Sequence, residues 1–182
     1  MLLQREIPDS VNLQVATIAS ASGVRVLLDV GGSNEEPLSD ELLSKISYLS
    51  PNETELARIT DMPTETQDEV IAACQKLLTK GMDGVLAKLG ARGSLLVTKD
   101  GSVHLQPAIE PPSPIVDTTG AGDAFTGGFV VGLAEGKSLQ DAMTLGSAAA
   151  SLSLTAKGAM GSFPKRPAVD ELVAYFNYSK SV

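Results

Sequence analysis

The sequence predicts an α/β fold in which helices alternate with the strands of a mostly parallel sheet. A helical pattern ends near Gly23, and an apolar, β-branched run follows it directly over 24–30. The same order recurs where a helical pattern over 66–80 precedes a second apolar run over 85–89. Continuous apolar strands are typical of covered parallel sheets, and their alternation with helices is typical of βαβ units.

The first helix is expected to begin at Ser10, because serine suits the N-cap position. Val11, Val15, Ile18 and Ala19 follow at helical spacing and predict its apolar face. Gly23 is expected to end the helix, since glycine adopts the left-handed conformation of many helix C-termini without strain. The strand over 24–30 then follows.

The remaining elements continue this alternation. We expect helices over 39–45, 53–59, 66–80, 121–135, 138–156 and 168–178, and strands over 46–49, 85–89, 94–98 and 103–106. Asp100-Gly101 marks a hairpin turn between the last two strands. Prolines at 107, 111, 112 and 114 exclude regular structure before the next helix. The whole chain is expected to form one domain.

Composition excludes several classes of function. The formal net charge of −8 argues against a broad nucleic-acid or anionic-membrane surface, although it leaves a local phosphate site open. The single cysteine, Cys74, excludes an internal disulfide, and its apolar helical surroundings indicate core packing. His104, the single histidine, is assigned no role. Neither a bilayer-spanning stretch nor a secretory pattern is recognisable, so a cytoplasmic setting is expected, or an organellar one if a transit peptide precedes this sequence.

The most informative motif is the run Asp117-Thr-Thr-Gly-Ala-Gly-Asp-Ala-Phe125, which is typical of a loop that enters a helix. Backbone N–H groups at such a helix start lack intrahelical partners, and glycine lets an anion approach them closely. Asp123 would lie in the first turn, where a carboxylate can accept a proton from a hydroxyl group. The alternative is an ordinary tight turn with an acidic residue that only complements the helix dipole.

The complete run from Asp117 to Phe129 strongly resembles the second signature of the ribokinase-like carbohydrate kinase family. The resemblance implies a three-layer α/β/α sandwich with a Rossmann-like, mostly parallel sheet. It also implies that Asp123 is the catalytic base and that the amides of Gly120, Ala121 and Gly122 form an anion hole.

Two further motifs match the family. Asn52 and Glu55 match an N-x-x-E motif that implies Mg²⁺ and phosphate binding, often through water, although the same pair can form a capping box for the following helix. The loop after the strand over 85–89 matches an L-G-x-x-G motif that implies nucleotide contacts, although a glycine-rich reversal with a solvated Arg92 is the simpler explanation. The nucleotide-binding candidates are Lys88, Gly90, Arg92, Gly93, Gly122 and Ser147.

The resemblance also implies a K⁺ site, formed by the first residues of the signature and the loop that follows the helix over 138–156. Its candidate ligands, several of them through main-chain carbonyls, are Asp117, Thr119, Ser153, Ala156, Gly158 and Ser162. The alternative for this loop is an ordinary helix end, since Lys157 in a last turn and Gly158 beyond it are common there.

By resemblance, the chain transfers phosphate from ATP to the primary hydroxyl of a sugar, with Mg²⁺ and K⁺ as cofactors. D-Ribose is favoured over fructose or a nucleoside such as adenosine because the ending over 157–164 is most similar to that of ribose kinases. A non-catalytic nucleotide-binding module is the alternative. Neither G-x-G-x-x-G after an early strand nor G-x-x-x-x-G-K-[ST] occurs, which disfavours dinucleotide-dependent oxidoreductases and P-loop NTPases.

The resemblance extends over the whole chain but covers only a little more than the C-terminal half of a complete family member. The strands that carry the family's sugar-binding Gly-Gly motif, and its small β lid, are not recognisable. ATP and a small sugar are the expected partners, with neither nucleic acid nor membrane. A homodimer is left open, although the lid through which the family dimerises is not recognisable.

Overall fold

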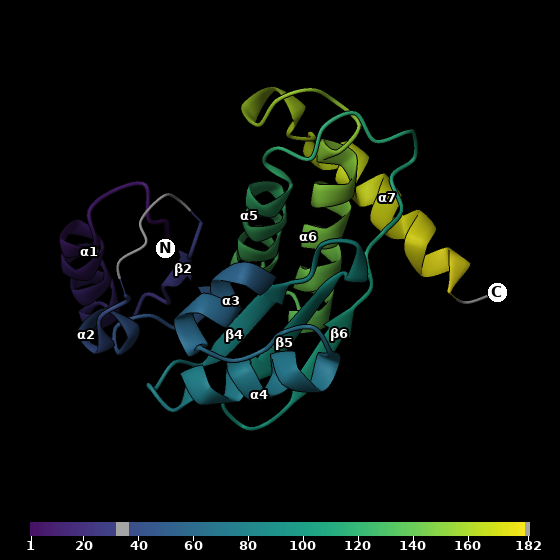
Figure 1. Ribbon diagram of the computed structural model, residues 1–182. Helices are drawn as coiled ribbons and strands as arrows, with labels where there is room; N and C mark the ends of the chain where they lie inside the picture. Colours follow the sequence, from purple (N-terminus) through teal and green to yellow (C-terminus); the bar gives the residue numbers. More distant parts are fainter. Residues whose placement is uncertain (32–36, 181–182) are drawn as a thin grey trace. The chain divides into compact units, whose positions relative to one another are not determined.

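The computed structural model describes residues 1–31 and 37–180 (Figure 1). The strands of this part are β1 (Leu2–Leu3), β2 (Leu27–Asp29), β3 (Tyr48–Ser50), β4 (Gly84–Lys88), β5 (Ser94–Thr98) and β6 (Val103–Gln106). The helices are α1 (Asp9–Ala21), α2 (Asp40–Leu43), α3 (Glu53–Thr60), α4 (Gln67–Leu78), α5 (Ala121–Ala134), α6 (Leu139–Ser153) and α7 (Arg166–Ser179), with short 3-10 turns η1 (Gly90–Arg92) and η2 (Met160–Ser162). The alternation confirms the predicted α/β class.

The sheet is mixed, and its strand order within the described residues is β1-β2-β3-β4-β5-β6. The pairs β1–β2, β2–β3 and β3–β4 are parallel. The connection from β4 to the neighbouring β5 consists only of residues 89–93. A connection of this length is too short for the crossover between two parallel strands. The predicted Asp-Gly turn joins β5 to β6, with Thr98 N bonded to Ser102 O at 3.0 Å and Gly101 at a φ of 85°.

The chain divides into two compact units. The first contains residues 1–89 and 95–104, and the second contains residues 90–94 and the chain from 105 onward. In the first unit the register places Leu3 opposite Leu28, Leu28 opposite Leu49, and Leu49 opposite Val85, so one row of buried side chains crosses four strands. This row accounts for the alignment of the strands, because a slip of one residue would move every apolar side chain to the other face.

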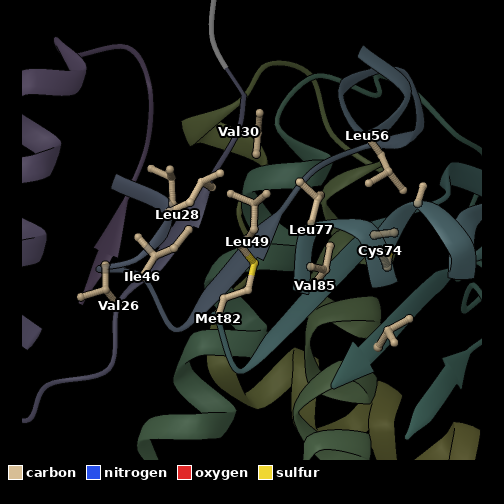
Figure 2. Close-up of a cluster of buried hydrophobic side chains, with 14 of the residues drawn as sticks. Val26, Leu28, Val30, Ile46, Leu49, Leu56, Cys74, Leu77, Met82 and Val85 are labelled. Carbon is tan, nitrogen blue, oxygen red and sulfur yellow. The ribbon is translucent and has the colours of Figure 1, made fainter. Parts of the chain in front are cut away.

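The core of the first unit is formed by these strands and by residues of helices α1 to α4, and Figure 2 shows part of it. Leu56 of α3 and Leu77 of α4 pack in the same cluster as Leu49 and Val85. Cys74 is fully buried in it, and burial raises the pKa of its thiol to about 12. The prediction that Cys74 packs in the core is therefore confirmed.

Helix α1 differs from the prediction at its start and on its buried face. It begins at Asp9 after Pro8, and no side chain caps it, so Ser10 is not the N-cap. The buried residues are Asn12, Ala16 and Ala19, whereas Val11 and Ile18 are 42% and 69% exposed. Apolar periodicity does not indicate that Asn12 is buried. Its amide nitrogen donates to Gln4 O at 2.8 Å, whereas its Oδ1 has no hydrogen-bond partner within the described residues.

The predicted strand over 24–30 is shorter in the structure, and β1 was not predicted at all. Gly23 has a φ of 71°, as its predicted place at the end of α1 requires. The predicted strands over 94–98 and 103–106 match β5 and β6 residue for residue. No helix within residues 1–31 and 37–180 is both long and apolar enough to cross a bilayer.

In the second unit, α5 and α6 pack closely because small residues face each other. A Cβ added at Gly128 would lie 2.8 Å from the Cα of Gly146, and one at Gly132 would lie 2.8 Å from the Cα of Ala142. Helix α7 packs on α6 through a small apolar cluster that includes Leu145 and Val169. The start of α5, which carries the signature motif, is therefore held on a tightly packed helix pair.

Candidate active site

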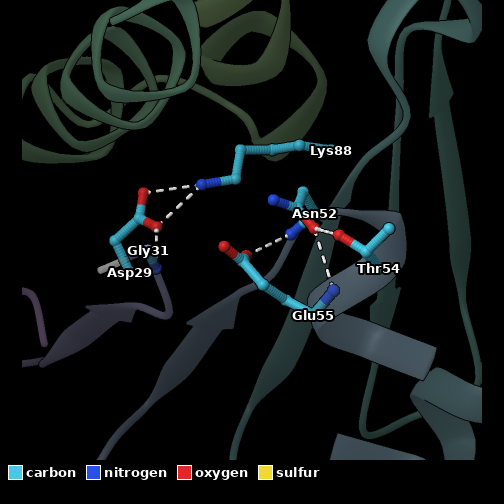
Figure 3. Close-up of polar contacts among 6 residues, drawn as sticks. All are labelled: Asp29, Gly31, Asn52, Thr54, Glu55 and Lys88. Carbon is cyan, nitrogen blue, oxygen red and sulfur yellow. Dashed lines mark hydrogen bonds and ion pairs between the residues drawn. The ribbon is translucent and has the colours of Figure 1, made fainter. Parts of the chain in front are cut away.

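In the first unit, several polar residues gather where three parallel strands end. This strand-end cluster consists of Asp29, Gly31, Asn52, Thr54, Glu55 and Lys88 (Figure 3). Asp29 is the last residue of β2, Lys88 is the last residue of β4, and Asn52 follows β3. The carboxyl ends of parallel strands are where open α/β sheets bind ligands.

An ion pair between Asp29 and Lys88 lies at this edge. The Nζ atom of Lys88 is 2.8 Å from each carboxylate oxygen of Asp29, and Asp29 Oδ1 also accepts from the amide of Gly31 at 3.1 Å. The two side chains are only 14% and 9% exposed. Lys88, a predicted nucleotide-binding residue, is thus held by a carboxylate that sequence reasoning missed. The available signal was Asp29 within the mostly apolar run over 24–30.

Asn52 and Glu55 form a capping box at the start of α3. This arrangement was one of the two predictions for the pair, the other being a role in Mg²⁺ and phosphate binding. Asn52 Oδ1 accepts from Glu55 N at 2.9 Å and from Thr54 Oγ1 at 2.8 Å, while Glu55 Oε2 accepts from Asn52 N at 2.7 Å. Within the described residues, Glu55 Oε1 has no protein partner. A backbone bridge between Asn52 and Lys88 places this pair beside the ion pair.

The strand-end cluster offers hard oxygen ligands of the type that Mg²⁺ prefers. The carboxylate oxygen of Glu55 that lies outside the capping box is the clearest donor, and Mg²⁺ normally keeps several water ligands. No group of three or more His, Cys, Asp or Glu side chains within residues 1–31 and 37–180 is arranged to hold a metal ion by itself. The residues present therefore fit Mg²⁺ bound largely through water.

The loop after β4 belongs to the second unit from residue 90 onward and is shaped by its two glycines. Gly90 and Gly93 have φ values of 54° and 92°, and a Cβ at Gly93 would lie 2.1 Å from the carbonyl oxygen of Gln106. Gly93 is therefore required by close backbone packing, whereas a Cβ at Gly90 would meet no heavy atom within 4 Å. The Arg92 side chain is exposed.

Ser147, the remaining nucleotide-binding candidate from α6, is buried and bonded within the protein. Its hydroxyl accepts from the amide of Ile109 at 3.2 Å and lies 3.4 Å from the carbonyl of Pro107, to which it donates. Its observed contacts tie α6 to the proline-rich segment before the signature.

The signature motif forms the predicted loop and helix start. Gly120 is the N-cap of α5 at a φ of 78°, and a Cβ there would lie 2.9 Å from the Cα of Ala159. Ala121 N donates to Thr118 O at 3.3 Å, so this amide is partly occupied. The amides of Gly122 and Asp123 have no hydrogen-bond partner in the described part of the chain, and the same holds for the exposed Asp123 carboxylate. Two backbone donors and one carboxylate, all open in the sense that they have no hydrogen-bond partner in the described part of the chain, thus lie in the same helical turn.

Asp117 ties the start of the signature to the loop after α6. Its carboxylate accepts from Thr119 N at 2.9 Å, from Thr119 Oγ1 at 2.7 Å and from Gly158 N at 2.8 Å. The bond from the Thr119 amide, then that from Gly158, hold the pKa of Asp117 at about 2. The amides of Val116 and Asp117 also donate to Leu154 O. The structure therefore brings together the two segments that carry the K⁺ candidates.

The remaining K⁺ candidates have oxygen atoms suited to a monovalent cation. Ser153 and Ser162 are buried, and each hydroxyl donates to a backbone carbonyl, of Ala150 and Ala159 respectively, at 2.7 Å. A hydroxyl that donates one bond keeps lone pairs for a cation. Ala156 N approaches Ser153 O at 3.5 Å, and Gly158 has a φ of 87°. The donor set is made of carbonyl and hydroxyl oxygens, which fits K⁺.

Parallel strands that end at a polar edge, and a helix start with open amides and a carboxylate, are features of α/β proteins that bind phosphate groups. The model of the pfkB carbohydrate kinase family matches residues 2–166, and the chain belongs to this family. Ribokinase of Arabidopsis thaliana is similar to it, with 49% identity over 175 residues that cover 96% of this chain and 46% of that protein.

Solved structures agree with this assignment. Arabidopsis thaliana ribokinase complexed with ribose and ATP matches with a TM-score of 0.91 and 48% identity, over 94% of this chain and 55% of that chain. Phosphofructokinase-2 from Escherichia coli in complex with potassium matches with a TM-score of 0.72 and 26% identity, over 91% of this chain and 52% of that chain. The chain thus spans about half the length of the relatives it matches.

Proposed function

We propose that this chain forms the nucleotide-binding and proton-accepting part of an ATP-dependent sugar kinase, with D-ribose as the acceptor. The observation that carries the proposal is the first turn of α5, where the open amides of Gly122 and Asp123 stand beside the open Asp123 carboxylate. The similarity to a ribokinase that was solved with ribose and ATP supports ribose and ATP as the substrates.

In the proposed reaction, the oxygen of the sugar's primary hydroxyl attacks the γ-phosphorus of ATP. Asp123 accepts the proton of that hydroxyl as the attack proceeds. The bond between that phosphorus and the ADP oxygen breaks, so the products are the sugar phosphate and ADP. Helix-start amides stabilise the charge on the transferred phosphoryl group, those of Gly122 and Asp123 being the open donors and those of Gly120 and Ala121 adjoining them.

The strand-end cluster supplies the second set of proposed roles. Asn52 and Glu55 would hold Mg²⁺ through water, and the bound ion neutralises charge on the phosphate oxygens. Lys88 would contact a phosphate of the nucleotide, and Asp29 would fix the position of its ammonium group. Gly90 and Gly93, with Arg92, would shape the loop that contacts the nucleotide.

A monovalent cation is proposed to bind between the start of the signature and the loop after α6, the two segments that Asp117 joins. Carbonyl oxygens of this loop pair, with the hydroxyls of Ser153 and Ser162, would hold K⁺ and so fix the loop that precedes α5. The potassium complex of the related phosphofructokinase-2 supports this proposal. K⁺ should therefore strengthen nucleotide binding or turnover, and no effect of K⁺ on either would contradict the proposed site.

The first test is ATP-dependent phosphorylation of D-ribose by the purified chain with Mg²⁺ and K⁺, with fructose and adenosine as alternative acceptors. Asp123→Asn should lower the transfer rate by about 10²–10⁴-fold, because it removes the base. ATP affinity measured by calorimetric titration should change little, because the amides remain. Parallel losses of rate and affinity would contradict the role of Asp123.

Asp141→Asn provides the matched control. Asp141 is also an acidic residue in the first turn of a helix, α6, but it is bonded to the N-cap Ser138. This variant should leave the transfer rate unchanged. ATP binding without transfer to any of the three acceptors would favour a nucleotide-binding module over a kinase.

A further inference from the structure

A buried polar network in the second unit joins the end of β6 to helix α6, and the proposed reaction does not use it. Gln106, the last residue of β6, is only 1% exposed. Its side-chain oxygen accepts from Thr144 Oγ1 at 2.8 Å and from Gln140 Nε2 at 3.1 Å. Its Nε2 atom donates to the carbonyl of Pro107 at 2.8 Å. Gln140 and Thr144 are four residues apart on α6 and therefore reach Gln106 from one face of that helix.

Side chains of α6 also bond the backbone of the segment that follows β6. Pro107 has no N–H group and cannot continue a strand ladder, so the backbone here needs other partners. Gln140 Nε2 donates to Leu105 O at 3.2 Å, and Ser147 Oγ accepts from Ile109 N at 3.2 Å. The segment over 105–109 is thus fixed on α6 by side chains.

The loop over 90–93 packs directly against this segment. A Cβ at Gly93 would lie 2.1 Å from Gln106 O and 2.6 Å from Ala108 N, so the two backbones are in close contact. The amide of Gly93 also donates to Gly90 O at 3.0 Å, which closes the loop. The position of the loop therefore depends on a segment that α6 holds in place.

The same turn of α6 contacts the helix that carries the signature motif. A Cβ at Gly146 would lie 2.6 Å from the carbonyl oxygen of Phe125, which is only two residues after Asp123 in α5. Residues 144–147 of α6 therefore contact the first turns of α5 and also hold the segment beneath the loop over 90–93.

The composition of the network indicates that it fixes a position. Burial of an amide side chain costs free energy unless its polar atoms are bonded. Both lone pairs of the Gln106 side-chain oxygen have donors, and its NH₂ group has an acceptor. An apolar side chain would fill the same space without these requirements. A satisfied polar network, by contrast, rigidifies its surroundings and specifies one arrangement of the groups that it joins.

We propose that Gln106 is a positioning residue that, through Thr144 and Gln140, fixes the loop over 90–93 relative to the helix start that carries Asp123. The inference rests on the proposed function, in which this loop contacts the nucleotide and Asp123 accepts the proton. A bound ATP must reach from the loop to the first turn of α5. The network therefore holds the two ends of the nucleotide site at the separation that ATP requires.

The test is Thr144→Val, which removes the hydroxyl donor and keeps the shape of the side chain. In the isotopically labelled chain without nucleotide, the amide signals of Gly90 and Gly93 should shift. ATP affinity, measured by calorimetric titration, should fall by up to about tenfold, because a buried acceptor loses a partner. Thr144→Ser keeps the hydroxyl and should restore both the signals and the affinity. Gln140→Leu, at a half-buried position, removes the other donor and should shift the same signals.

Thr60→Val is the matched control. Thr60 is also a buried threonine on a helix, and its hydroxyl donates to Leu56 O at 2.7 Å. This variant should leave the Gly90 and Gly93 signals in place even where its unfolding midpoint falls, so a loss of stability alone does not reproduce the effect.

Unshifted loop signals in both Thr144→Val and Gln140→Leu, or equal shifts in Thr60→Val, would overturn the proposal. Shifted loop signals with unchanged ATP affinity would overturn it as well. An unmodified chain that does not bind ATP would contradict the proposed function, and the loop signals alone would then decide whether Gln106 positions the loop.

Discussion

At the scale of single residues, the Asp29–Lys88 pair is the most consequential contact of the first unit. Two charges that are 9% and 14% exposed have lost most of their hydration, and their mutual contact at 2.8 Å offsets that loss. Such a pair adds little net stability compared with an apolar pair, but removal of one partner leaves a buried charge uncompensated. In the proposed kinase, a nucleotide phosphate would become a second anionic partner for Lys88.

Asp29→Asn is expected to lower the free energy of unfolding by about 3 kcal/mol, because the Lys88 ammonium then lacks its counter-ion. The double variant Asp29→Asn/Lys88→Met should be more stable than the single one, since no buried charge remains. Urea denaturation would measure both. The exposed pair formed by Lys99 and Asp83 is the control, and Lys99→Met should change stability little. A double variant less stable than Asp29→Asn alone would contradict this account of the pair.

Some site residues could be predicted from the sequence and others could not, and the difference has a physical cause. Asn52 and Glu55 are a local pair, and the structure confirms the capping box because its geometry depends only on neighbouring backbone. Asp29 contacts Lys88 across 59 positions of sequence, which no local pattern records. The packing of Gly93 against Gln106 is likewise non-local, although the glycines themselves suggested a tight loop.

At the scale of elements, the segment before α5 and the loop after α6 are joined by one carboxylate. Asp117 accepts bonds from Thr119 and from Gly158, and these bonds lower its pKa from 3.8 to about 2. Because the pKa is lowered in the folded state, the bonds stabilise the loop pair above pH 3.8 and are lost only as the pH falls through about 2. The loop pair should therefore stay joined at mildly acidic pH.

This pH dependence can be measured through the amide proton shift of Gly158, which should titrate with a midpoint near pH 2. Thr119→Val removes the hydroxyl donor and should raise that midpoint. The Ser102 amide, which donates to Asp100 in the hairpin, should keep its own midpoint in the variant. A Gly158 midpoint near 3.8 in the unmodified chain would show that the bond does not persist in solution.

Elements were predicted well where the local signals are strong. The Asp-Gly turn fixed the hairpin, and α2 and α4 begin after the N-caps Ser39 and Thr66, the first residues of their predicted ranges. Helix α1 was predicted with the wrong start, and of its predicted face Ala19 is buried but Val11 and Ile18 are exposed. The contact that Asn12 makes on the buried face lies outside the helix. The strand β1 has two residues and is defined by its pairing with β2, so its own sequence carries no strand pattern.

At the scale of the whole molecule, apolar side chains are exposed at the β1 edge of the sheet within residues 1–31 and 37–180. Strand β1 is the outermost strand in the order, and Leu2 is 42% exposed. Val11 and Ile18, in the helix α1 that follows β1 in the sequence, are also exposed. An edge strand offers unpaired backbone groups, and exposed apolar residues beside it favour association with another chain.

We therefore expect the chain to self-associate as its concentration rises, with β1 and α1 in the contact. Sedimentation velocity across a wide concentration range would detect it as a rising average mass. Ile18→Glu should shift the equilibrium toward the monomer, because a charge would be buried in the contact. Tyr175→Glu on α7 is the matched control, since Tyr175 is 70% exposed and Ile18 is 69% exposed. A chain that stays monomeric throughout, or equal effects of the two variants, would show that this edge does not drive association.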